Sequence, residues 1–184
     1  MVSLVDLWLP ILLSAVLVFV ASSVIHMVLH QWHAQDFKRF AAEDAVMDAL
    51  RPFNLGPGDY AAPVPESMAH MSSAEFKAKL ARGPSFSLTI LANTSMAQNL
   101  VKWFVYSVVV ALFAAYVASI ALPAATPYMT VFRVTSTVAF VGYALALWQN
   151  WIWYSRGLGY TVRTTIDGLV YGLLTGGVFG WLWP

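Results

Sequence analysis

Four apolar stretches, each about as long as a lipid bilayer is thick, constrain the fold of this chain more than any other feature. A membrane-spanning helix needs roughly 20 mostly apolar residues. Such stretches cover about residues 7–29, 103–122, 128–154 and 166–183. They predict an all-α integral membrane protein with four transmembrane helices. The expected single membrane domain spans residues 1–184, with a helical cytoplasmic loop between the first two spans.

The composition agrees with a membrane protein and excludes several other classes. Of the 184 residues, 59% are hydrophobic and 10% are charged, against about 25% charged residues in soluble domains. The formal net charge is +1, so the chain lacks the basic field that nucleic-acid binding requires. Because there is no cysteine, disulfides, thiolate nucleophiles and iron–sulfur clusters are excluded.

The positions of Lys and Arg predict the orientation in the membrane. Basic residues gather in the first and third loops, at Lys38, Arg39, Arg51, Lys77, Lys79, Arg82, Lys102, Arg156 and Arg163. Because Lys and Arg resist translocation, both loops should be cytoplasmic and both termini extracytoplasmic. No Lys or Arg precedes the first span, which therefore is expected to be a retained anchor and not a signal peptide.

The polar loop over residues 34–98 carries helix signals of its own. Phe37, Phe40, Met47 and Leu50 fall near one face of a helix that would continue the first span. A Ser-Ser-Ala-Glu pattern at 72–75 predicts a short helix ending at the Gly-Pro pair 83–84. The segment 86–91 alternates apolar and polar residues and is compatible with a strand or an interfacial strip.

Two rows of small residues predict helix–helix packing, because helices in lipid associate through close contact of small side chains. The rows are Gly168, Gly172, Gly176 and Gly180 in the fourth span and Ser107, Ala111, Ala115 and Ser119 in the second. We expect each row to pack against a neighbouring helix, in this chain or in a partner. A path for a substrate along the glycines is the alternative.

Three histidines and an aspartate lie where the first span leaves the membrane. If the helix continues, His26, His30 and His33 form a ladder within about 60° of one face, followed by Asp36. Imidazoles and a carboxylate are transition-metal ligands. Three histidines spread over about 10 Å of axis cannot all reach one ion. Candidates for completing the site are His70, Glu66 and Asp167.

Other readings of these histidines stay open. They can simply hydrogen-bond lipid headgroups at the interface, or handle protons, and His26 alone is a candidate ligand for a tetrapyrrole. A bis-histidine haem is excluded because the other three spans contain no histidine. A membrane di-iron site is excluded because the chain has four histidines and, by analogy with that enzyme class, about eight are needed.

Polar residues inside spans are functional candidates by default. They are Arg133, Gln149, Asn150 and Asp167. Arg133 is expected to extend toward the outer surface. The pattern Thr164–Asp167 predicts a cap at the start of the fourth span, and Asp167 is expected to contact Arg163 one turn earlier. No catalytic motif occurs, and no catalytic residue is assigned.

Several segments resemble a known group of proteins. The opening LWLPILLSAVLVFVASSVIHMVLHQWHAQDF, the loop element GPGDY, FRVTSTVAFVGYALA and the closing DGLVYGLLTGGVFGWLWP resemble a family of small bacterial four-helix inner-membrane proteins, known mostly as hypothetical proteins. The resemblance covers most of the chain and implies no activity. It implies that His26, His33 and Asp36 are typical, whereas position 30 is often Pro, which favours a site built on His26 and His33.

Three functions remain on the sequence alone. The first is a non-enzymatic accessory or assembly subunit of a larger bacterial membrane complex, with the bilayer and a membrane-protein partner or a second copy as its contacts. The second is a membrane protein that binds a metal or cofactor through His26, His30, His33 and Asp36. The third is a small oligomeric transporter, disfavoured by the low intramembrane charge.

Overall fold

The computed structural model describes residues 2–184, and the chain divides into two compact units. The helical unit comprises the N-terminal segment up to Lys38 together with Ser95–Pro184, and the loop unit is Arg39–Thr94. The helical unit contains α1 (Trp8–Ser23), a π-helical turn (Val24–Val28), a 3-10 turn (His30–Trp32), α5 (Met96–Ala121), α6 (Tyr128–Tyr143), a 3-10 turn (Leu145–Leu147), α7 (Trp148–Tyr154) and α8 (Leu158–Trp181).

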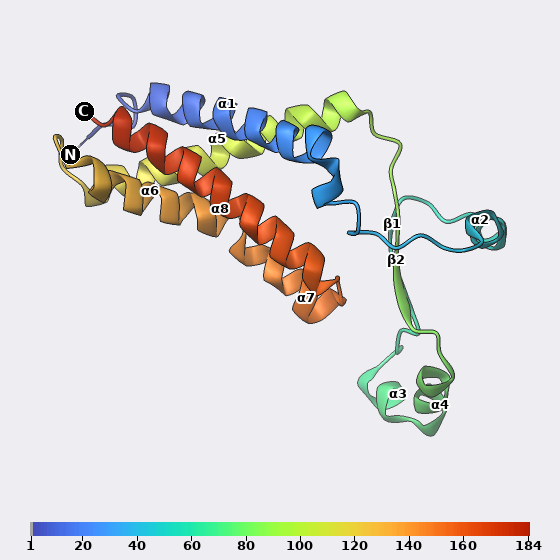
Figure 1. The fold of residues 1–184 in the computed structure, drawn as a ribbon. Coiled ribbons are helices and arrows are strands. Elements are labelled where there is room, and N and C mark those ends of the chain that lie inside the picture. Colours follow the sequence, from blue (N-terminus) through green and yellow to red (C-terminus); the bar gives the residue numbers. More distant parts are fainter. Residues whose placement is uncertain (1) are drawn as a thin grey trace. The chain divides into compact units, whose positions relative to one another are not determined.

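The four long helices of the helical unit form an up-and-down bundle (Figure 1). The helix α1 packs against α5 and α8, and α6 packs against the same two helices, so that the four surround a common axis. Both chain ends lie at one end of this bundle (Figure 1). There the Ala125 N–H donates to the Pro184 carbonyl oxygen at 2.6 Å. Toward the opposite end, Ser22 near the end of α1 and Tyr143 at the end of α6 line a common cavity with Thr164, Asp167 and Tyr171 of α8.

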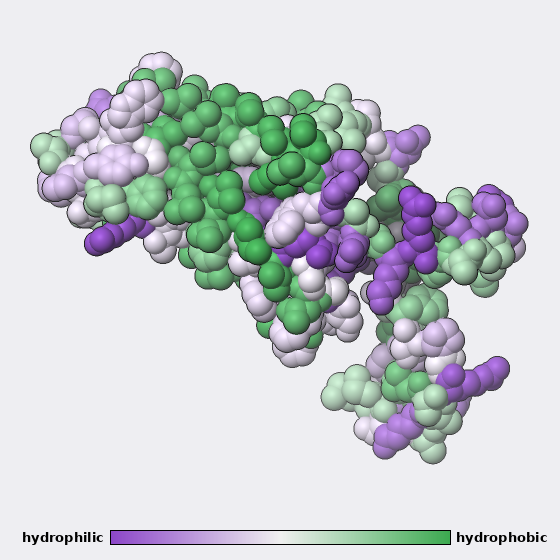
Figure 2. All heavy atoms as spheres, viewed as in Figure 1, coloured by the Kyte–Doolittle hydropathy of each residue, from purple (hydrophilic) through white to green (hydrophobic). Residues whose placement is uncertain are grey.

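Three helical stretches within residues 2–184 are long and apolar enough to cross a membrane: Trp8–Val28, Met96–Ala121 and Tyr128–Tyr154. The third consists of α6, the 3-10 turn and α7, because the backbone leaves helical dihedrals at Ala144 (φ −125°). Large apolar side chains such as Leu12, Leu112 and Phe113 point away from the bundle and are exposed. Figure 2 shows this apolar surface as a green zone along the helices.

The interior of the bundle contains many small residues beside a few large ones. Ala15, Ala111 and Ala115 are almost completely buried, as are Ser14 and Thr175. The buried hydroxyls donate to carbonyl oxygens of their own helices, for example from Ser14 to Pro10 at 2.7 Å. Large side chains such as Phe179 and Tyr171 are buried between them. The small residues allow the close backbone approach that drives helix association in lipid.

Two helices of the bundle begin earlier than the sequence predicts. The helix α5 begins at Met96 instead of 103, because Ser95 and Gln98 form a capping box in which the backbone N–H of each residue donates to the side-chain oxygen of the other. The helix α8 begins at Leu158 instead of 166. The predicted cap at Thr164 is wrong, because this residue lies within the helix and its hydroxyl donates to the Tyr160 carbonyl at 3.0 Å.

The loop unit combines short helices with a two-stranded ribbon. It contains α2 (Glu43–Leu50), β1 (Gly58–Ala62), α3 (Met68–Ser72), α4 (Ala74–Arg82) and β2 (Phe86–Ile90). The strands pair antiparallel, with Gly58 opposite Ile90. The ribbon resolves the ambiguity at 86–91 in favour of a strand and departs from the all-α expectation. The helix α4 lies where the Ser-Ser-Ala-Glu pattern predicts one, with Ser73 as its cap.

Candidate metal centre

The candidate site begins where α1 loses its regular geometry. A π-helical turn over Val24–Val28 is followed by Leu29, whose dihedrals (φ −92°, ψ 36°) end the helix. The predicted amphipathic continuation through residues 34–53 is therefore wrong, and the histidines do not form a ladder on one helix face. Instead the chain turns back, and the His33 ring stacks on the His26 ring with centroids 4.5 Å apart and an interplanar angle of 9°.

Three potential ligand atoms converge at this turn. His26, His33 and Asp167 each offer one atom, and these atoms lie within 4.8 Å of one another. His33 Nε2 lies 2.9 Å from Asp167 Oδ2. Asp167 comes from α8, 134 residues away in sequence from His33. The side chains of His33 and Asp167 are 14% and 6% exposed, whereas His26 is exposed, so that the group is shielded from solvent on the side of His33 and Asp167 and open on the side of His26.

Each of the three side chains is held by a second contact on its far side. His26 Nδ1 donates to the Ser22 carbonyl oxygen at 2.9 Å, and His33 Nδ1 lies 2.6 Å from Asp36 Oδ2. Trp32 Nε1 donates to Asp167 Oδ1 at 2.9 Å. A carbonyl oxygen can only accept, so His26 Nδ1 carries a proton, and in the neutral ring the lone pair is on Nε2. The groups left to converge are therefore His26 Nε2, His33 Nε2 and Asp167 Oδ2.

A charge network surrounds the three residues. Arg163 Nε donates to Asp36 Oδ1 at 2.8 Å, and its Nη2 contacts the same oxygen. With both carboxylates ionised, both ring nitrogens of His33 donate, and Asp36, Asp167, Arg163 and His33 together carry no net charge. The structure departs here from the expected contact between Asp167 and Arg163: although they are one turn apart, each pairs with the segment that follows α1.

The other predicted site residues lie elsewhere. His30 is exposed and does not join the convergent group. His70 and Glu66 belong to the loop unit, where the Glu66 N–H donates to His70 Nδ1 at 3.2 Å. Asp36 contacts His33 as a neighbour and is not one of the three convergent residues.

The polar residues predicted inside the third span do not meet at this site. Arg133 is exposed on α6, and its carbonyl oxygen accepts from the Thr137 hydroxyl at 2.7 Å. Gln149 is exposed on α7. The carbonyl oxygen of the half-buried Asn150 accepts from the Arg156 N–H at 3.1 Å. Of the four residues singled out, Asp167 is the one that the structure brings to the histidines.

Both rows of small residues lie inside the bundle. A Cβ added at Gly176 would lie 2.7 Å from Ser136 Cβ, and one added at Gly180 would lie 2.8 Å from the Tyr128 ring. Gly168 and Gly172 meet α6 at similarly short distances. In α5, the row Ser107, Ala111, Ala115 and Ser119 is buried, on a helix that packs against α1 and α6. The two packing faces are thus filled within the chain.

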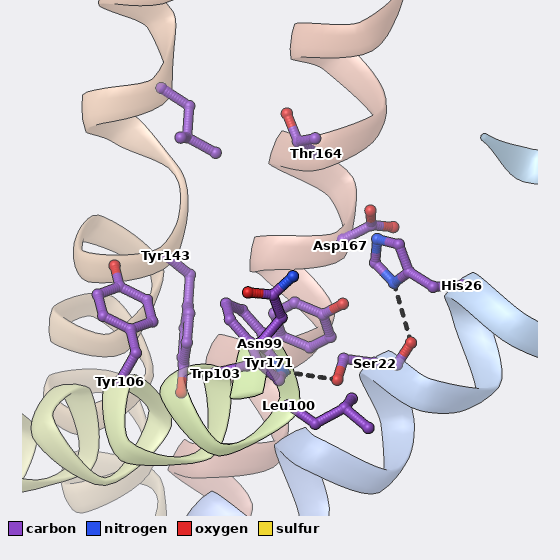
Figure 3. A pocket seen from close by; sticks show the side chains of 11 residues that line it. Ser22, His26, Asn99, Leu100, Trp103, Tyr106, Tyr143, Thr164, Asp167 and Tyr171 are labelled. Atoms are coloured by element: carbon purple, nitrogen blue, oxygen red, sulfur yellow. Dashed lines mark hydrogen bonds between the residues drawn. The ribbon is translucent and has the colours of Figure 1, made fainter. Parts of the chain in front are cut away.

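A cavity of about 510 Å³ adjoins the convergent group. Figure 3 shows its wall, which is lined by Ser22 from α1, His26 from the π-helical turn, Trp103 and Tyr106 from α5, Tyr143 from α6, and Asp167 and Tyr171 from α8. Ser22 joins the two features, because its carbonyl accepts from His26 and its hydroxyl accepts from Trp103 Nε1 at 2.7 Å.

The arrangement does not suit a tetrapyrrole on His26. Its Nδ1 is used by the Ser22 carbonyl, and its Nε2 faces His33 and Asp167 within 4.8 Å. A macrocycle bound through Nε2 would extend across the positions of both neighbours. The site fits a single ion between two imidazoles and a carboxylate.

The sequence does not predict three further residues of this site. Trp32 follows the first apolar stretch, where a tryptophan typically anchors a span in the headgroup region, and its indole N–H instead donates to Asp167. Tyr171 and Tyr143 lie within apolar stretches. A signal existed for them, since a phenol within an apolar helix must find a hydrogen-bond partner or a ligand. No signal in the sequence pairs Trp32 with Asp167 or Arg163 with Asp36.

Comparisons with known proteins add no constraint. No known protein family, no curated protein and no solved structure matches this chain.

Proposed function

We propose that this chain is a four-span protein of a bacterial inner membrane that binds a divalent transition metal. The membrane part rests on three apolar helices of spanning length. We add α8 as the fourth span, because its 24 residues reach about 36 Å and pack along α6. With the basic residues near the other end of the bundle, both termini would be extracytoplasmic. The bacterial source rests on the resemblance of the sequence.

The observation that carries the metal proposal is the convergence of His26, His33 and Asp167 with their outer contacts already made. In metal sites, a ligating imidazole donates its second N–H to a carbonyl or carboxylate, which fixes the ring and raises its basicity. Here the Ser22 carbonyl accepts the hydrogen bond from His26 Nδ1, and the Asp36 carboxylate lies against His33 Nδ1. Arg163 in turn donates a hydrogen bond to Asp36. An ordinary interfacial histidine needs none of this support.

The ligand set indicates the class of ion. Two imidazoles and one carboxylate suit Zn²⁺ or Fe²⁺, and three protein ligands leave coordination positions open. Without metal, the same residues form a closed salt-bridge network in which a proton on His33 Nε2 occupies the place of the ion. An ion bound there would act as a Lewis acid on a molecule entering from the adjacent cavity.

The accessory-subunit hypothesis stays a prediction, and the two rows of small residues do not argue for a partner. The rows are buried within this chain, as one of the two expectations for them had it. A substrate path along the glycines needs space on that side of α8, whereas α6 fills it.

Metal binding by the purified protein tests the proposal. The protein in detergent is dialysed against Zn²⁺ or Fe²⁺ under anaerobic conditions, and bound metal is counted by mass spectrometry. We expect one ion per chain, lost in His26→Ala, His33→Ala and Asp167→Asn. His30→Ala is the matched control, since it removes an exposed histidine from the same segment and should bind like wild type.

The outcome separates a site from unspecific binding. Equal binding by the His30→Ala and His33→Ala variants would indicate that histidines bind metal at random. An absence of tight binding in the folded wild-type protein would leave a salt-bridge network in place of a metal site. Thermal unfolding of each variant shows whether it is folded.

A further inference from the structure

The cavity beside the convergent group has a chemical character that the metal proposal does not use. Its lining includes four aromatic residues, Trp103, Tyr106, Tyr143 and Tyr171. Their rings pack around one another with centroid separations from 5.4 Å, between Tyr143 and Tyr171, to 6.0 Å, between Trp103 and Tyr143. Faces and edges of this kind suit a flat ring in the ligand.

A buried hydroxyl in the cavity has no partner. Tyr171 is 3% exposed, and its hydroxyl has no hydrogen-bond partner among residues 2–184. The Tyr143 hydroxyl is in the same situation, although the Ser107 hydroxyl lies near it, so Tyr171 is the stricter case. A buried phenol hydroxyl without a hydrogen-bond partner is costly, and a ligand oxygen that accepts a hydrogen bond from it would remove that cost.

The position of Tyr171 aims this donor at the polar end of the cavity. Asp167 and Tyr171 are four residues apart on α8 and therefore lie on the same face, one turn from each other. Figure 3 shows the Tyr171 ring in the cavity between Trp103 and the pair of Asp167 and His26. A ligand oxygen near Tyr171 therefore lies at the end where His26 and Asp167 are found.

The charge of the lining selects a neutral ligand. Among the described residues that line the cavity, none is Lys or Arg, and Asp167 is acidic. In the metal-free protein, phosphate or carboxylate headgroups would meet no Lys or Arg in this lining and would face the Asp167 carboxylate. The remaining lining is mostly apolar and is carried by helices of membrane-spanning character, which favours a molecule that partitions into the bilayer.

We propose that the cavity binds the ring of a membrane-soluble quinone, whose carbonyl oxygen accepts the hydrogen bond of Tyr171. A quinone is a flat, neutral ring with carbonyl acceptors and an apolar tail, and so combines the four properties that the cavity requires. A volume of about 510 Å³ is within the range of small-molecule sites and holds such a ring with the start of its tail. Binding does not depend on metal, and the proposal stands apart from the metal site.

The test uses a benzoquinone with a ten-carbon tail as the ligand and decylbenzene as the matched probe without carbonyl groups. Binding is measured by calorimetry on the full-length protein in detergent, first after treatment with EDTA and then after loading with Zn²⁺. We expect saturable binding of one quinone per chain in both states, and weak or no binding of decylbenzene.

Variants identify the hydrogen bond and the cavity. Tyr171→Phe removes the hydroxyl and keeps the ring, and should weaken quinone binding about tenfold. It should not lower the melting temperature, because the lost group has no partner in the chain. Tyr154→Phe, at an exposed tyrosine of α7, is the control and should bind as wild type. Leu147→Trp places an indole at the cavity wall and should abolish binding.

Equal affinity of wild type and Tyr171→Phe, equal binding of the quinone and decylbenzene, or no saturable binding in either state would each overturn the proposal. Quinone binding by EDTA-treated protein that also fails to take up Zn²⁺ would sustain the cavity proposal while rejecting the metal site.

Discussion

Along α8, the residues from Gly168 to Gly180 and those from Arg163 to Asp167 meet their neighbours by different physical means. At Gly168, Gly172, Gly176 and Gly180 the backbone of α8 lies so close to its neighbours that an added Cβ would be only 2.7 to 3.0 Å from another atom. The charged segment contacts the chain beyond α1 through hydrogen bonds and ion pairs. The first contact depends on shape, and the second depends on matching each donor and acceptor. The two should therefore respond differently to substitution.

Removal of the cation from the charged segment should have the largest effect. Arg163→Met keeps most of the side-chain stem and leaves the Asp36 carboxylate, whose side chain is 5% exposed, without its guanidinium. Breaking a buried pair costs about 3–5 kcal/mol when the remaining charge is left alone, and the contact of Asp36 with His33 Nδ1 should keep the cost near the lower end of that range. We expect a marked fall in the melting temperature measured by tryptophan fluorescence in detergent. Arg156→Met, at an exposed position nearby, should change it little, and equal effects would show that the Asp36 contact contributes nothing.

The second largest loss of stability should follow when a large side chain is introduced at one of the buried glycines. Gly176→Leu forces a side chain against Ser136 and Phe132, where even a Cβ would lie within 2.8 Å of both residues. Overpacking of this kind costs about 1–3 kcal/mol, and the melting temperature should fall.

The adjacent glycine provides the control for this variant. At Gly177, an added Cβ would contact one atom, the Tyr128 hydroxyl oxygen at 3.8 Å. Gly177→Ala should be neutral or stabilising, since alanine favours helix by about 1 kcal/mol over glycine. A similar loss at both positions would mean that the α6 contact is not what the glycines serve.

Loss of the hydrogen bond from Trp32 to Asp167 should have a smaller effect, which we expect to be confined to metal binding. Trp32→Phe removes the indole N–H that holds Asp167 Oδ1 and keeps an aromatic ring. Loss of such an outer contact weakens metal binding about 10–100-fold. Titration with Zn²⁺ against a competing chelator measures the change. Trp153→Phe, which alters a highly exposed tryptophan on α7, should leave the affinity unchanged. A Trp32→Phe protein with wild-type affinity would show that Asp167 is not a ligand.

The smallest effect should follow from Ser22→Ala. It removes the hydroxyl that accepts from Trp103 Nε1 and leaves the carbonyl that accepts from His26. The loss of one hydrogen bond costs about 1 kcal/mol, visible as a small decrease in melting temperature, while metal affinity should persist. If metal binding were lost as well, the hydroxyl and not the carbonyl would be orienting His26.

The same contrast explains which parts of the structure the sequence predicts. The glycines repeat every fourth residue, and a periodic pattern on one helix identifies a packing face without knowledge of the partner. The apolar stretches are likewise local signals. The apolar run alone predicts starts for α5 and α8 that are several residues late, because polar first turns precede the apolar part of each helix. For α5 the capping residues Ser95 and Gln98 mark the actual start.

The polar cluster depends on information that no local pattern contains. The spacing of the histidines in the sequence predicts a ladder only if the helix is unbroken. The π-helical turn and the break at Leu29 move His30 away and fold His33 back onto His26. Asp167 was named among several candidates for completing the site. Its selection over His70 and Glu66 follows from a contact between α8 and a segment 134 residues away in the chain.

X-ray absorption spectroscopy of the Zn²⁺-loaded protein decides whether His26 and His33 are ligands, because it counts the imidazoles bound to the ion. We expect two imidazole ligands and one carboxylate oxygen in wild type and in His30→Ala, and a single imidazole for any ion retained by His33→Ala. A wild-type spectrum with no imidazole ligand, or one that is unchanged in His33→Ala, would contradict this expectation.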